Sequence, residues 1–387
     1  MALVQTAVAI VVFAILFRYV AEQSELKAES WNSPTPLPNL ETNDILARFG
    51  ERILKGNVLG PESLVFDSEG YLFTGLMDGR IIKINTKTLE FDTFAQYNSS
   101  CKPVVGLYDD YPPEREPLCG RPLGLRFDKE KRLLVAESYS GLHRLSADGK
   151  AREVLVDKVE GRSITFINDV DVASDDGTIY FTETSDRWGR SKVVSEIIAS
   201  RPVGTLVSFH PSDPYGTMKV YRGFLPCNGV TLSHDEKSVF FVSGPRIYKL
   251  DRASQTVSLA LDNAPAVMDN IRRRKGIPHR FLIGCASKRA APFSLPDVLA
   301  PYPAVRNVMS FFLPQWVILK FIPRMGMLLE VDLTPGKERV VRSFQDRRSD
   351  GIAYVSEGEE HSDGFTYIGT WHEDHLVRAK TKDLLGD

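Results

Sequence analysis

The sequence predicts an all-β fold: a six-bladed β-propeller with an N-terminal membrane anchor helix and a helical, apolar insert before the last blade. Three observations lead to this prediction. A phrase of polar loop, alternating apolar run, turn and second alternating run recurs six times, and repeats of about 40 to 80 residues built from short strands are typical of propellers. The chain also begins with a long apolar run. Finally, one long apolar segment interrupts the strand pattern.

The N-terminal run predicts a membrane anchor. Residues 7–17 are uncharged and lie within an apolar stretch at 2–20, broken by Gln5 and Arg18. Its length is close to the roughly 17 to 25 residues that span a bilayer. A cleaved signal peptide is the alternative, although it should show a basic start and small residues at the cleavage site. We therefore expect residues 1–20 to be an uncleaved signal anchor. The positive-inside tendency would place Arg18, which follows the run, in the cytosol.

The remaining chain divides into a stalk and the propeller. Residues 21–50 include a Ser-Pro-Thr-Pro-Leu-Pro stretch, which favours an extended chain without helix. We expect the propeller to occupy residues 51–387, with residues 375–379 as the strand that closes the ring. The six copies begin near Gly60, Gly120, Ile167, Cys227, Met268 and Ser349.

The insert at 292–327 is too long for an ordinary connection. It contains Phe311, Phe312, Trp316 and Phe321, with few cations. Amphipathic helices over one end of the propeller would suit this composition, either as a lid or as a surface that faces a membrane. The alternative is a helix whose apolar face packs on the propeller and is buried.

Cysteine usage and one sequon indicate the secretory pathway. Cys101 and Cys119 flank a loop that lacks apolar periodicity, and a disulfide there would stabilise the fold by about 3 kcal/mol in the chain-entropy model. Asn98 begins a glycosylation sequon beside this loop. All four cysteines could instead be free, and Cys227 and Cys285 are predicted to be buried thiols. We expect a single-pass membrane protein of the endoplasmic reticulum, secretory pathway or plasma membrane, with the propeller luminal or extracellular.

Oxygen-bearing side chains recur in the loop that leads into each copy, which we call the lead-in loop. Equivalent positions of a propeller converge on its axis, and calcium takes six to eight oxygen ligands. Asn and Asp also cap turns, but their recurrence in four of six copies favours a calcium (Ca²⁺) site. No His or Cys cluster has zinc-like spacing, and the net charge of −2 argues against nucleic-acid binding. The predicted ligands are Glu62, Asn168, Asn228, Asp269 and Asn270.

Four phrases resemble those of the strictosidine synthase-like family. They are CGRPLG from Cys119, FINDVDV from Phe166, CNGVTLS from Cys227 and MDNIR from Met268, and the similarity extends from about Glu51 to the end. This family is similar to the paraoxonases, the gluconolactonases and other calcium-dependent six-bladed hydrolases. The resemblance implies that Glu62, Asn168, Asn228 and Asp269 are calcium ligands, with Asn270 beside Asp269 as in the paraoxonases.

Two positions depart from the patterns that the resemblance implies. Ser356 stands where strictosidine synthases have a catalytic Glu, with Glu357 next to it, so a condensation of the strictosidine synthase type is not expected. Leu123 stands where paraoxonases have a His that helps to activate water. Any proton transfer must therefore use another group.

The remaining candidates for catalysis are an arginine and three histidines. Arg121 could orient an anionic leaving group, although it could instead hold the disulfide loop. His361 is the second catalytic candidate, and His143 and His372 are further conceivable proton acceptors; each histidine has an alternative as a surface or strand residue.

These features predict a membrane-tethered, calcium-dependent hydrolase of the arylesterase or lactonase type. Its substrates would be small esters or lactones, whose carbonyl a calcium ion polarises for attack by water. The alternative is a non-catalytic binding propeller in which calcium is structural. We expect contact with the membrane through the anchor and through residues 292–327, and no nucleic-acid partner.

Overall fold

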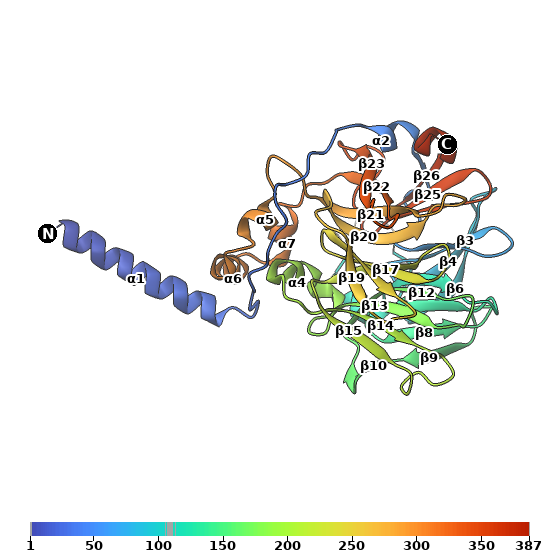
Figure 1. The fold of residues 1–387 in the computed structure, drawn as a ribbon, viewed down its shortest axis with the longest axis horizontal. Coiled ribbons are helices and arrows are strands. Elements are labelled where there is room, and N and C mark those ends of the chain that lie inside the picture. The colour runs from blue at the N-terminus through green and yellow to red at the C-terminus, as the bar shows by residue number, and fades with distance from the viewer. Residues whose placement is uncertain (1, 105, 107–110, 113, 387) are drawn as a thin grey trace.

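Six antiparallel sheets of four strands follow one another along the chain, which confirms the six-bladed propeller. The computed structural model describes residues 2–386 except 105, 107–110 and 113. Figure 1 shows the strands as one body, with helix α1 projecting from it and helices α4 to α7 gathered at the base of α1. Clusters of buried apolar side chains fill the fold, and several of them join neighbouring blades.

Each blade is a meander of consecutive strands, numbered here from the channel outward. The first blade contains β2 (Leu64–Phe66), β3 (Tyr71–Gly75), β4 (Arg80–Asn85) and β5 (Phe91–Gln96). The second contains β6 (Pro122–Phe127), β7 (Leu133–Glu137), β8 (Gly141–Leu145) and β9 (Arg152–Val156). The third contains β12 (Phe166–Val172), β13 (Ile179–Ser185), β14 (Gly204–Phe209) and β15 (Lys219–Phe224).

The next two blades repeat this order. The fourth contains β16 (Cys227–Leu232), β17 (Ser238–Ser243), β18 (Arg246–Asp251) and β19 (Val257–Leu261). The fifth contains β20 (Ala266–Arg273), β21 (Arg280–Lys288), β22 (Gly326–Asp332) and β23 (Arg339–Asp346). A two-stranded ribbon of β10 (Lys158–Val159) and β11 (Arg162–Ser163) joins the second blade to the third.

The sixth blade joins the two ends of the chain. It contains β24 (Val355–Glu360), β25 (Phe365–Thr370) and β26 (Leu376–Lys380), followed by α8 (Thr381–Leu385). Its outer strand is β1 (Glu51–Ile53), which pairs antiparallel with β26. The prediction that residues 375–379 close the ring is therefore wrong in its detail. Residues 376–379 lie in the third strand, and β1 closes the ring, so main-chain hydrogen bonds tie the segment before the first blade to the last blade.

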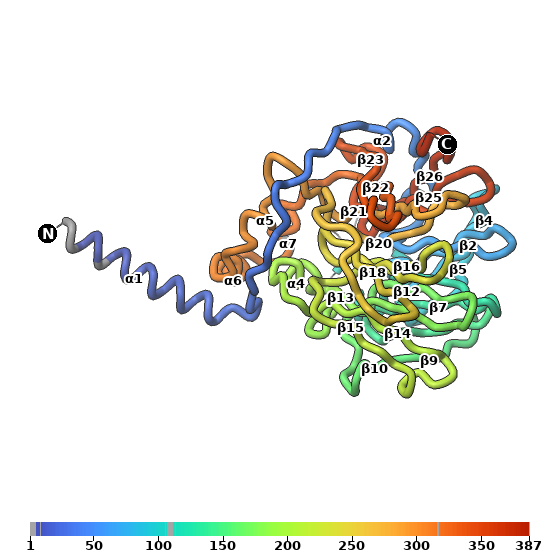
Figure 2. The backbone as a smooth tube through the Cα atoms, in the orientation of Figure 1, coloured from blue at the N-terminus to red at the C-terminus, as the bar shows by residue number. Residues whose placement is uncertain are grey.

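Helix α1 (Ala2–Gln23) is the only candidate membrane span in the described part of the chain, over Gln5–Gln23. The predicted stalk does not stand free of the domain. Residues 24–50, including α2 (Ile45–Phe49), run along the propeller and end in β1 (Figure 2). The main chain of this strap is hydrogen-bonded to the folded domain, for example from Ala291 N to Pro38 O at 2.9 Å.

The insert lies inside the fifth blade, between β21 and β22. It contains α5 (Leu295–Leu299), α6 (Pro303–Phe312) and α7 (Gln315–Leu319). A second helical connection, η2 (Arg190–Lys192) and α4 (Val193–Ala199), joins β13 to β14. We call these two connections, residues 186–203 and 289–325, the cap.

Strand direction decides where the cap lies. The inner strand of each blade runs away from its lead-in loop, and the second strand runs back. The connection between the second and third strands is therefore at the same end of the propeller as the lead-in loops. We call this end the mouth, and the predicted calcium ligands and the cap share it.

A candidate calcium centre at the mouth of the channel

The predicted ligands lie where the inner strands depart from regular pairing. The registers of β12, β16 and β20 each shift at the same place, at Asn168, at Asn228 and at Asp269 with Asn270. A β-bulge bends its strand and re-aims a side chain, and bulges are common next to active sites. Glu62 precedes β2, and its N–H donates to Gly75 O at 3.3 Å. The four blades thus turn their oxygen donors toward one end of the channel.

Glycine explains part of the phrase CNGVTLS. A Cβ atom on Gly229, which follows Asn228 in the bulge of β16, would lie 2.5 Å from Ile271 N and 2.6 Å from Asn270 Cα. Because any larger residue would collide with the main chain of β20, Gly229 allows the fourth and fifth inner strands to approach closely. The donors of the two blades are brought together by this approach.

The ligand set is largely buried, and one side-chain oxygen of each member lacks a hydrogen-bond partner among the described residues. Asn228 is half-buried, and the other four side chains are at most 4% exposed. Each buried polar atom left unpaired costs about 1–3 kcal/mol. Among the described residues no hydrogen bond is made to Glu62 Oε2, Asn168 Oδ1, Asn228 Oδ1, Asp269 Oδ1 or either terminal atom of Asn270. Five unpartnered donors at one end of one channel fit a hard cation that takes oxygen ligands.

A hydrogen-bond chain fixes which end of Asn168 faces the site. Asn168 Nδ2 donates to Thr184 Oγ1 at 3.1 Å, and Thr184 Oγ1 donates to Cys227 O at 2.7 Å. The amide nitrogen is therefore occupied, and the carbonyl oxygen is left for a ligand. Thr184 lies on the second strand of its blade, and the sequence analysis did not find it.

The pKa values of the two carboxylates, Glu62 and Asp269, are both raised. Burial raises the pKa of Glu62 to about 7, and the guanidinium groups of Arg121 and Arg190 oppose the rise. Burial and the neighbouring Glu62 raise the pKa of Asp269 well above its ordinary value, against a hydrogen bond from Asn228. Without a cation, both groups hold a proton more tightly than they would in water.

The donor types also decide which metal fits. Among the described residues, no group of three or more His, Cys, Asp or Glu side chains is placed to hold a metal ion. The set at the mouth has two carboxylates and three amide oxygens. Such a set suits calcium, which accepts neutral oxygens, and gives no soft ligand for zinc or copper.

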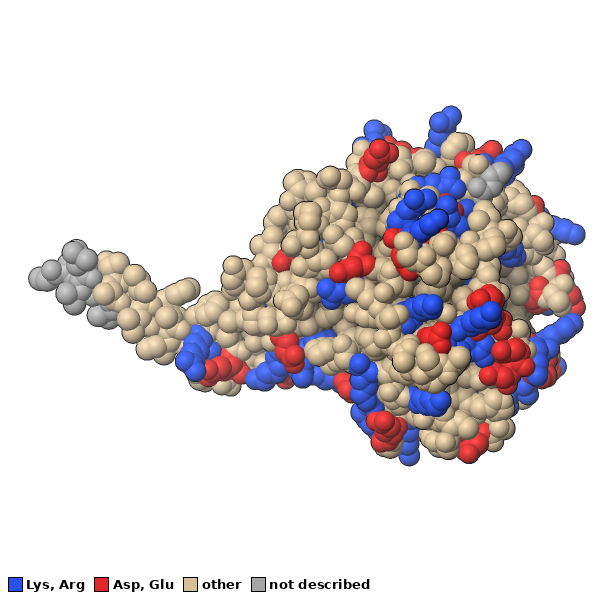
Figure 3. Space-filling model, viewed as in Figure 1, with Lys and Arg blue, Asp and Glu red and all other residues tan. Residues whose placement is uncertain are grey.

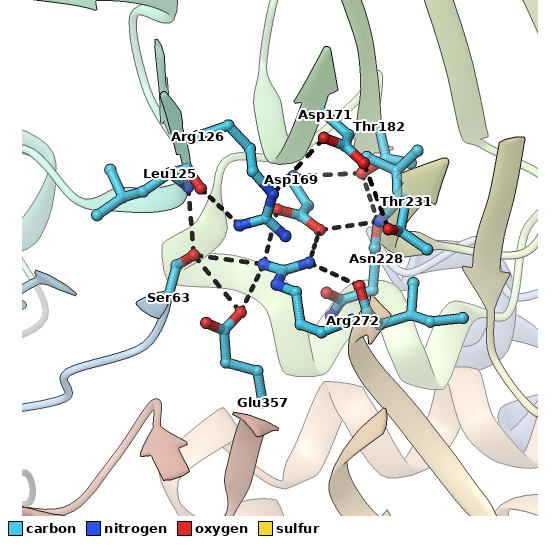
Figure 4. A network of polar contacts seen from close by, with 12 residues as sticks. Ser63, Leu125, Arg126, Asp169, Asp171, Thr182, Asn228, Thr231, Arg272 and Glu357 are labelled. Atoms are coloured by element: carbon cyan, nitrogen blue, oxygen red, sulfur yellow. Dashed lines mark hydrogen bonds and ion pairs between the residues drawn. The ribbon is translucent and has the colours of Figure 1, made fainter. Parts of the chain in front are cut away.

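Below these ligands an ion network closes the channel. Arg272 donates to both oxygens of Asp169, at 2.7 and 3.1 Å, and pairs with Glu357 Oε2 at 2.5 Å (Figure 4). All three side chains are at most 2% exposed. They come from the third, fifth and sixth blades, so the network ties distant parts of the ring together.

Main-chain and hydroxyl groups of the other blades complete the network. Ser63 Oγ accepts from Leu125 N at 3.2 Å and from Arg272 Nη2 at 3.3 Å, and Asp169 Oδ2 accepts from Val230 N at 2.9 Å. Nearby, Asp171 accepts from Leu232 N at 2.8 Å. All six blades therefore contribute to the network, in which Arg272 Nε is without a hydrogen-bond partner among the described residues. The sequence analysis did not predict this network, although Asp169 lies in the phrase FINDVDV and Arg272 in the phrase MDNIR.

Leu123 and Ser356 occupy the bulges of the two blades that supply no ligand. The register of β6 shifts between Pro122 and Leu125, and that of β24 shifts between Val355 and Glu357. Ser356 Oγ donates to Glu62 O at 2.6 Å, so it holds the first lead-in loop in place. Neither side chain can act as a base, which agrees with the departures noted in the sequence.

Arg121 lies beside the site. It is fully buried, and its Nη1 donates to Gly60 O at 2.7 Å while its N–H donates to Glu137 Oε1 at 2.6 Å. It therefore holds the first lead-in loop, and its charge acts on Glu62. Its contacts thus suit a positioning role at the mouth.

The histidines are spread over the molecule. His361 stacks on Phe66 with ring centroids 4.0 Å apart, and both residues lie at the far ends of their inner strands. Since Ser356 of the same strand contacts Glu62, His361 is one strand length from the ligands. The structure therefore does not bring His361 together with the ligand set.

Two other histidines lie toward the mouth. Burial lowers the pKa of His143 to about 4, and its ring accepts or donates only locally, near Ser140. His372 lies between β25 and β26, with Nδ1 3.3 Å from Glu373 Oε1. The same loop binds the first lead-in loop, because Gly60 N donates to Glu373 O at 2.8 Å. The loop of His372, which also contains His375, thus adjoins the ligand set.

The disulfide is confirmed. Cys101 and Cys119 are joined with their Cα atoms 5.7 Å apart, and Cys227 and Cys285 are free and buried. Part of the loop between Cys101 and Cys119 lies outside the described residues. The side chain of Asn98 adjoins this loop, and its Nδ2 donates to Leu118 O at 2.9 Å. Glycosylation of Asn98 stays a prediction.

Comparison with known proteins places the chain. Residues 168–261 match the family described as strictosidine synthase, and residues 39–84 match the one described as strictosidine synthase-like, N-terminal. Adipocyte plasma membrane-associated protein of Mus musculus is 30% identical over 87% of this chain and 79% of its own. Strictosidine synthase-like 10 of Arabidopsis thaliana is 30% identical over 80% of this chain and 82% of its own.

Solved structures share the fold at much lower identity. A gluconolactonase from Xanthomonas campestris covers 92% of this chain and 98% of its own, with a TM-score of 0.52 and 13% identity. A luciferin-regenerating enzyme covers 86% of this chain and 94% of its own, with a TM-score of 0.54 and 12% identity. At these identities the likeness shows the propeller fold alone.

Proposed function

Because this chain belongs to the strictosidine synthase-like family, we propose that it is a membrane-tethered, calcium-dependent hydrolase that acts on small esters or lactones. The observation that carries the proposal is the set of buried oxygens without partners, contributed by four blades to the mouth of one channel. A gluconolactonase and a luciferin-regenerating enzyme use the same fold, so this architecture is compatible with enzymatic activity.

The ligand set would hold the cation and orient the substrate. Glu62, Asn168, Asn228, Asp269 and Asn270 offer five of the six to eight oxygens that calcium takes. When bound, the ion supplies Lewis acidity toward the carbonyl oxygen of an ester or lactone. The ion network of Arg272 closes the channel below, so a substrate can approach only from the mouth.

Proton transfer needs a separate group, since Leu123 and Ser356 cannot supply it. We infer that His372 accepts the proton from the attacking water. Its Nδ1 lies 3.3 Å from Glu373 Oε1. Its loop is joined to the first lead-in loop by the hydrogen bond from Gly60 N to Glu373 O, which brings an imidazole close to the ligand set. Arg121, which is buried and holds Gly60 O, would position the first lead-in loop and Glu62.

Tethering rests on α1. Its side chains are exposed along most of its length, among them Phe13 at 69%, and this suits a lipid rather than an aqueous environment. Relatives named for association with the adipocyte plasma membrane support an anchor. We propose a luminal or extracellular propeller, supported by the disulfide, with Asn98 as a glycosylation site.

Hydrolysis of phenyl acetate by the full-length protein in detergent tests the proposal. The rate is measured with calcium, with a chelator, and for Asn168→Ala, His372→Gln and the control His361→Gln. We expect activity to require calcium and Asn168. We expect His372→Gln to lower kcat by about a hundredfold, in the range of general-base catalysis, while His361→Gln leaves it unchanged because that residue lies at the far end of the channel.

The second candidate function is a binding propeller in which calcium only stabilises the fold. The absence of a base at position 123 favours it. Calcium-dependent melting without hydrolysis of esters or lactones would support this second function. Calcium-independent hydrolysis would contradict both candidates.

A further inference from the structure

The cap exposes a group of large apolar side chains to its surroundings. Their exposure ranges from 37% for Ile197 to 66% for Phe321, far more than a buried face would allow. Figure 3 shows the region over α5 to α7 as largely free of Lys, Arg, Asp and Glu, in contrast to the charged propeller. Contiguous exposed apolar patches mark a surface that meets another apolar phase. The group comprises Ile197, Phe293, Leu295, Val298, Tyr302, Phe311, Phe312 and Phe321.

The candidate membrane span leaves the protein at this same surface. Among the side chains of α1 and its continuation whose burial the structure describes, the buried ones lie at the end of the helix and just after it, at Ala21, Ser24 and Leu26. Ser24 Oγ and Ser310 Oγ are hydrogen-bonded at 3.0 Å, and Ala28 N donates to Asn307 Oδ1 at 2.9 Å. The base of α1 is therefore seated on α6, the helix that ends in Phe311 and Phe312.

A buried arginine fixes α6 to its surroundings. Arg306, 3% exposed, donates to the carbonyl oxygens of Ile198 and Ala199 at the end of α4 and to that of Ala300 after α5. It also donates to Glu29 O in the strap. Because one guanidinium holds four main-chain carbonyls, the cap and the strap form one unit.

The strap transmits this fixed geometry to the propeller. Trp31 N donates to Ala300 O at 3.4 Å, and Gln345 Nε2 donates to Glu41 O at 2.7 Å in the fifth blade. The strap then enters β1, which is paired within the sixth blade. The direction of α1 relative to the mouth is thus set by the fold and not by a free linker.

Ion pairs of both signs surround the base of α1. Arg18 pairs with Glu22 at 2.8 Å, and Lys192 lies 3.9 Å from Glu25. They mark the boundary between the apolar helix and the domain, which is where headgroups lie when a span enters a bilayer. Side chains of both charges at this boundary suit zwitterionic headgroups.

We propose that the exposed apolar side chains of the cap insert into the surface of the bilayer that α1 enters. The bilayer is the occupant because the patch is continuous with the base of the only candidate span among the described residues, and that span is held rigidly against it. The mouth of the channel then faces the membrane. If the proposed hydrolase function holds, on which this consequence rests, an ester or lactone dissolved in the bilayer reaches the site without crossing bulk water.

Lipid quenching of a probe on the cap tests the proposal in the full-length protein. Phe312→Cys is labelled with an environment-sensitive fluorophore, since the two native free cysteines are buried, and the protein is placed in phosphatidylcholine vesicles that contain a nitroxide-labelled lipid. The matched control is Tyr215→Cys, an aromatic position that is 56% exposed against 65% for Phe312. It lies in the connection from β14 to β15, at the end of the propeller away from the mouth. We expect a blue shift and strong quenching at 312, and neither at 215.

A second variant separates the cap from its neighbour α1. With the probe at Val298→Cys in α5, the changes Phe311→Ser and Phe312→Ser should reduce quenching, because they remove the inserted side chains and leave α1 intact. Equal quenching at 312 and 215 would overturn the proposal. So would self-quenching at 312 that grows with protein concentration without lipid quenching, because the patch would then bind a second copy. Neither measurement depends on hydrolysis, so failure here leaves the hydrolase proposal standing, and the reverse also holds.

Discussion

The mouth of the channel and the cap above it both depart from the usual pattern in which apolar side chains are buried and charged ones are exposed. In the channel, polar side chains such as Asp269 and Arg272 are buried, whereas in the cap large apolar side chains such as Phe312 and Phe321 are exposed. Burying a charge is unfavourable unless it is paired, and exposing a large apolar patch to water is unfavourable as well.

In each region, a ligand from outside the chain would offset the unfavourable burial or exposure. The ion network around Arg272 pairs its charges within the protein, whereas one oxygen of each predicted ligand is without a partner among the described residues, which is the basis of the proposed calcium site. The cap is held together by Arg306, but its outer face is exposed, which is the basis of the proposed contact with a bilayer. The comparison teaches that buried polar atoms without partners and exposed apolar side chains lead to two separate proposals, a cation for the channel and a bilayer for the cap.

The largest expected effect comes from breaking the buried ion network. Arg272→Met should destabilise the protein by about 3–5 kcal/mol, because Asp169 and Glu357 would remain as buried, uncompensated carboxylates. The control is Arg144→Met, whose pair with Glu153 is exposed and should contribute less than about 1 kcal/mol. Thermal and denaturant unfolding give both values. Equal losses for the two variants would show that the network is not a closed, buried one.

The next effect is the pH dependence of the calcium-free protein. Since the folded pKa of Glu62 is about 7 and its ordinary value is 4.5, the fold favours the protonated carboxyl. Stability from this group is therefore present below about pH 4.5 and is lost as pH rises to about 7, by up to about 3 kcal/mol. With chelator, the melting temperature should be higher at pH 6 than at pH 8.

Glu62→Gln provides the control for this pH effect. It should reduce the pH dependence, and Asp269, whose pKa is shifted in the same direction, should keep part of it. If the melting temperature of Glu62→Gln changed with pH as steeply as that of the wild type, Glu62 would already be ionised in the folded protein. Water would then reach its carboxylate despite its burial.

Calcium itself should have a moderate effect on stability. At a tenfold excess over Kd, a ligand that binds only the folded state adds about 1.4 kcal/mol. Asp269→Ala should abolish this gain, whereas Asp171→Asn should keep it, because that buried carboxylate accepts from Leu232 N and Thr231 Oγ1 within the network. Calorimetry with and without chelator measures both. If calcium stabilised Asp269→Ala as much as the wild type, the calcium site would not lie at the mouth.

The smallest effect on stability is expected in the cap. Phe312→Ser should change the free energy of unfolding in detergent by no more than about 0.5 kcal/mol, because the side chain is exposed. Phe181→Ala, at a fully buried position of the third blade, should cost about 3–5 kcal/mol in the same assay. A large loss in Phe312→Ser would mean that this face is covered by protein and not by lipid.

Much of the candidate site could be predicted from the sequence. Glu62, Asn168, Asn228, Asp269 and Asn270 all lie at the mouth, because each copy repeats the same local pattern and a propeller brings equivalent positions together. What escaped prediction was non-local. Thr184 turns the amide of Asn168 from the adjacent strand, and Arg272 reaches Asp169 across the channel from another blade.

The sequence by itself determined the repeated strands, the apolar N-terminal run and the pair of cysteines, because alternation, run length and loop composition are local properties of the chain. Only the tertiary structure decided that β1 closes the ring, that residues 24–50 lie along the propeller, and that His361 is far from the ligands while the loop of His372 adjoins them. These outcomes depend on which ends meet when six blades close into a ring, and closure is set by packing and main-chain pairing between residues more than 300 positions apart, as in Glu51 with Arg378.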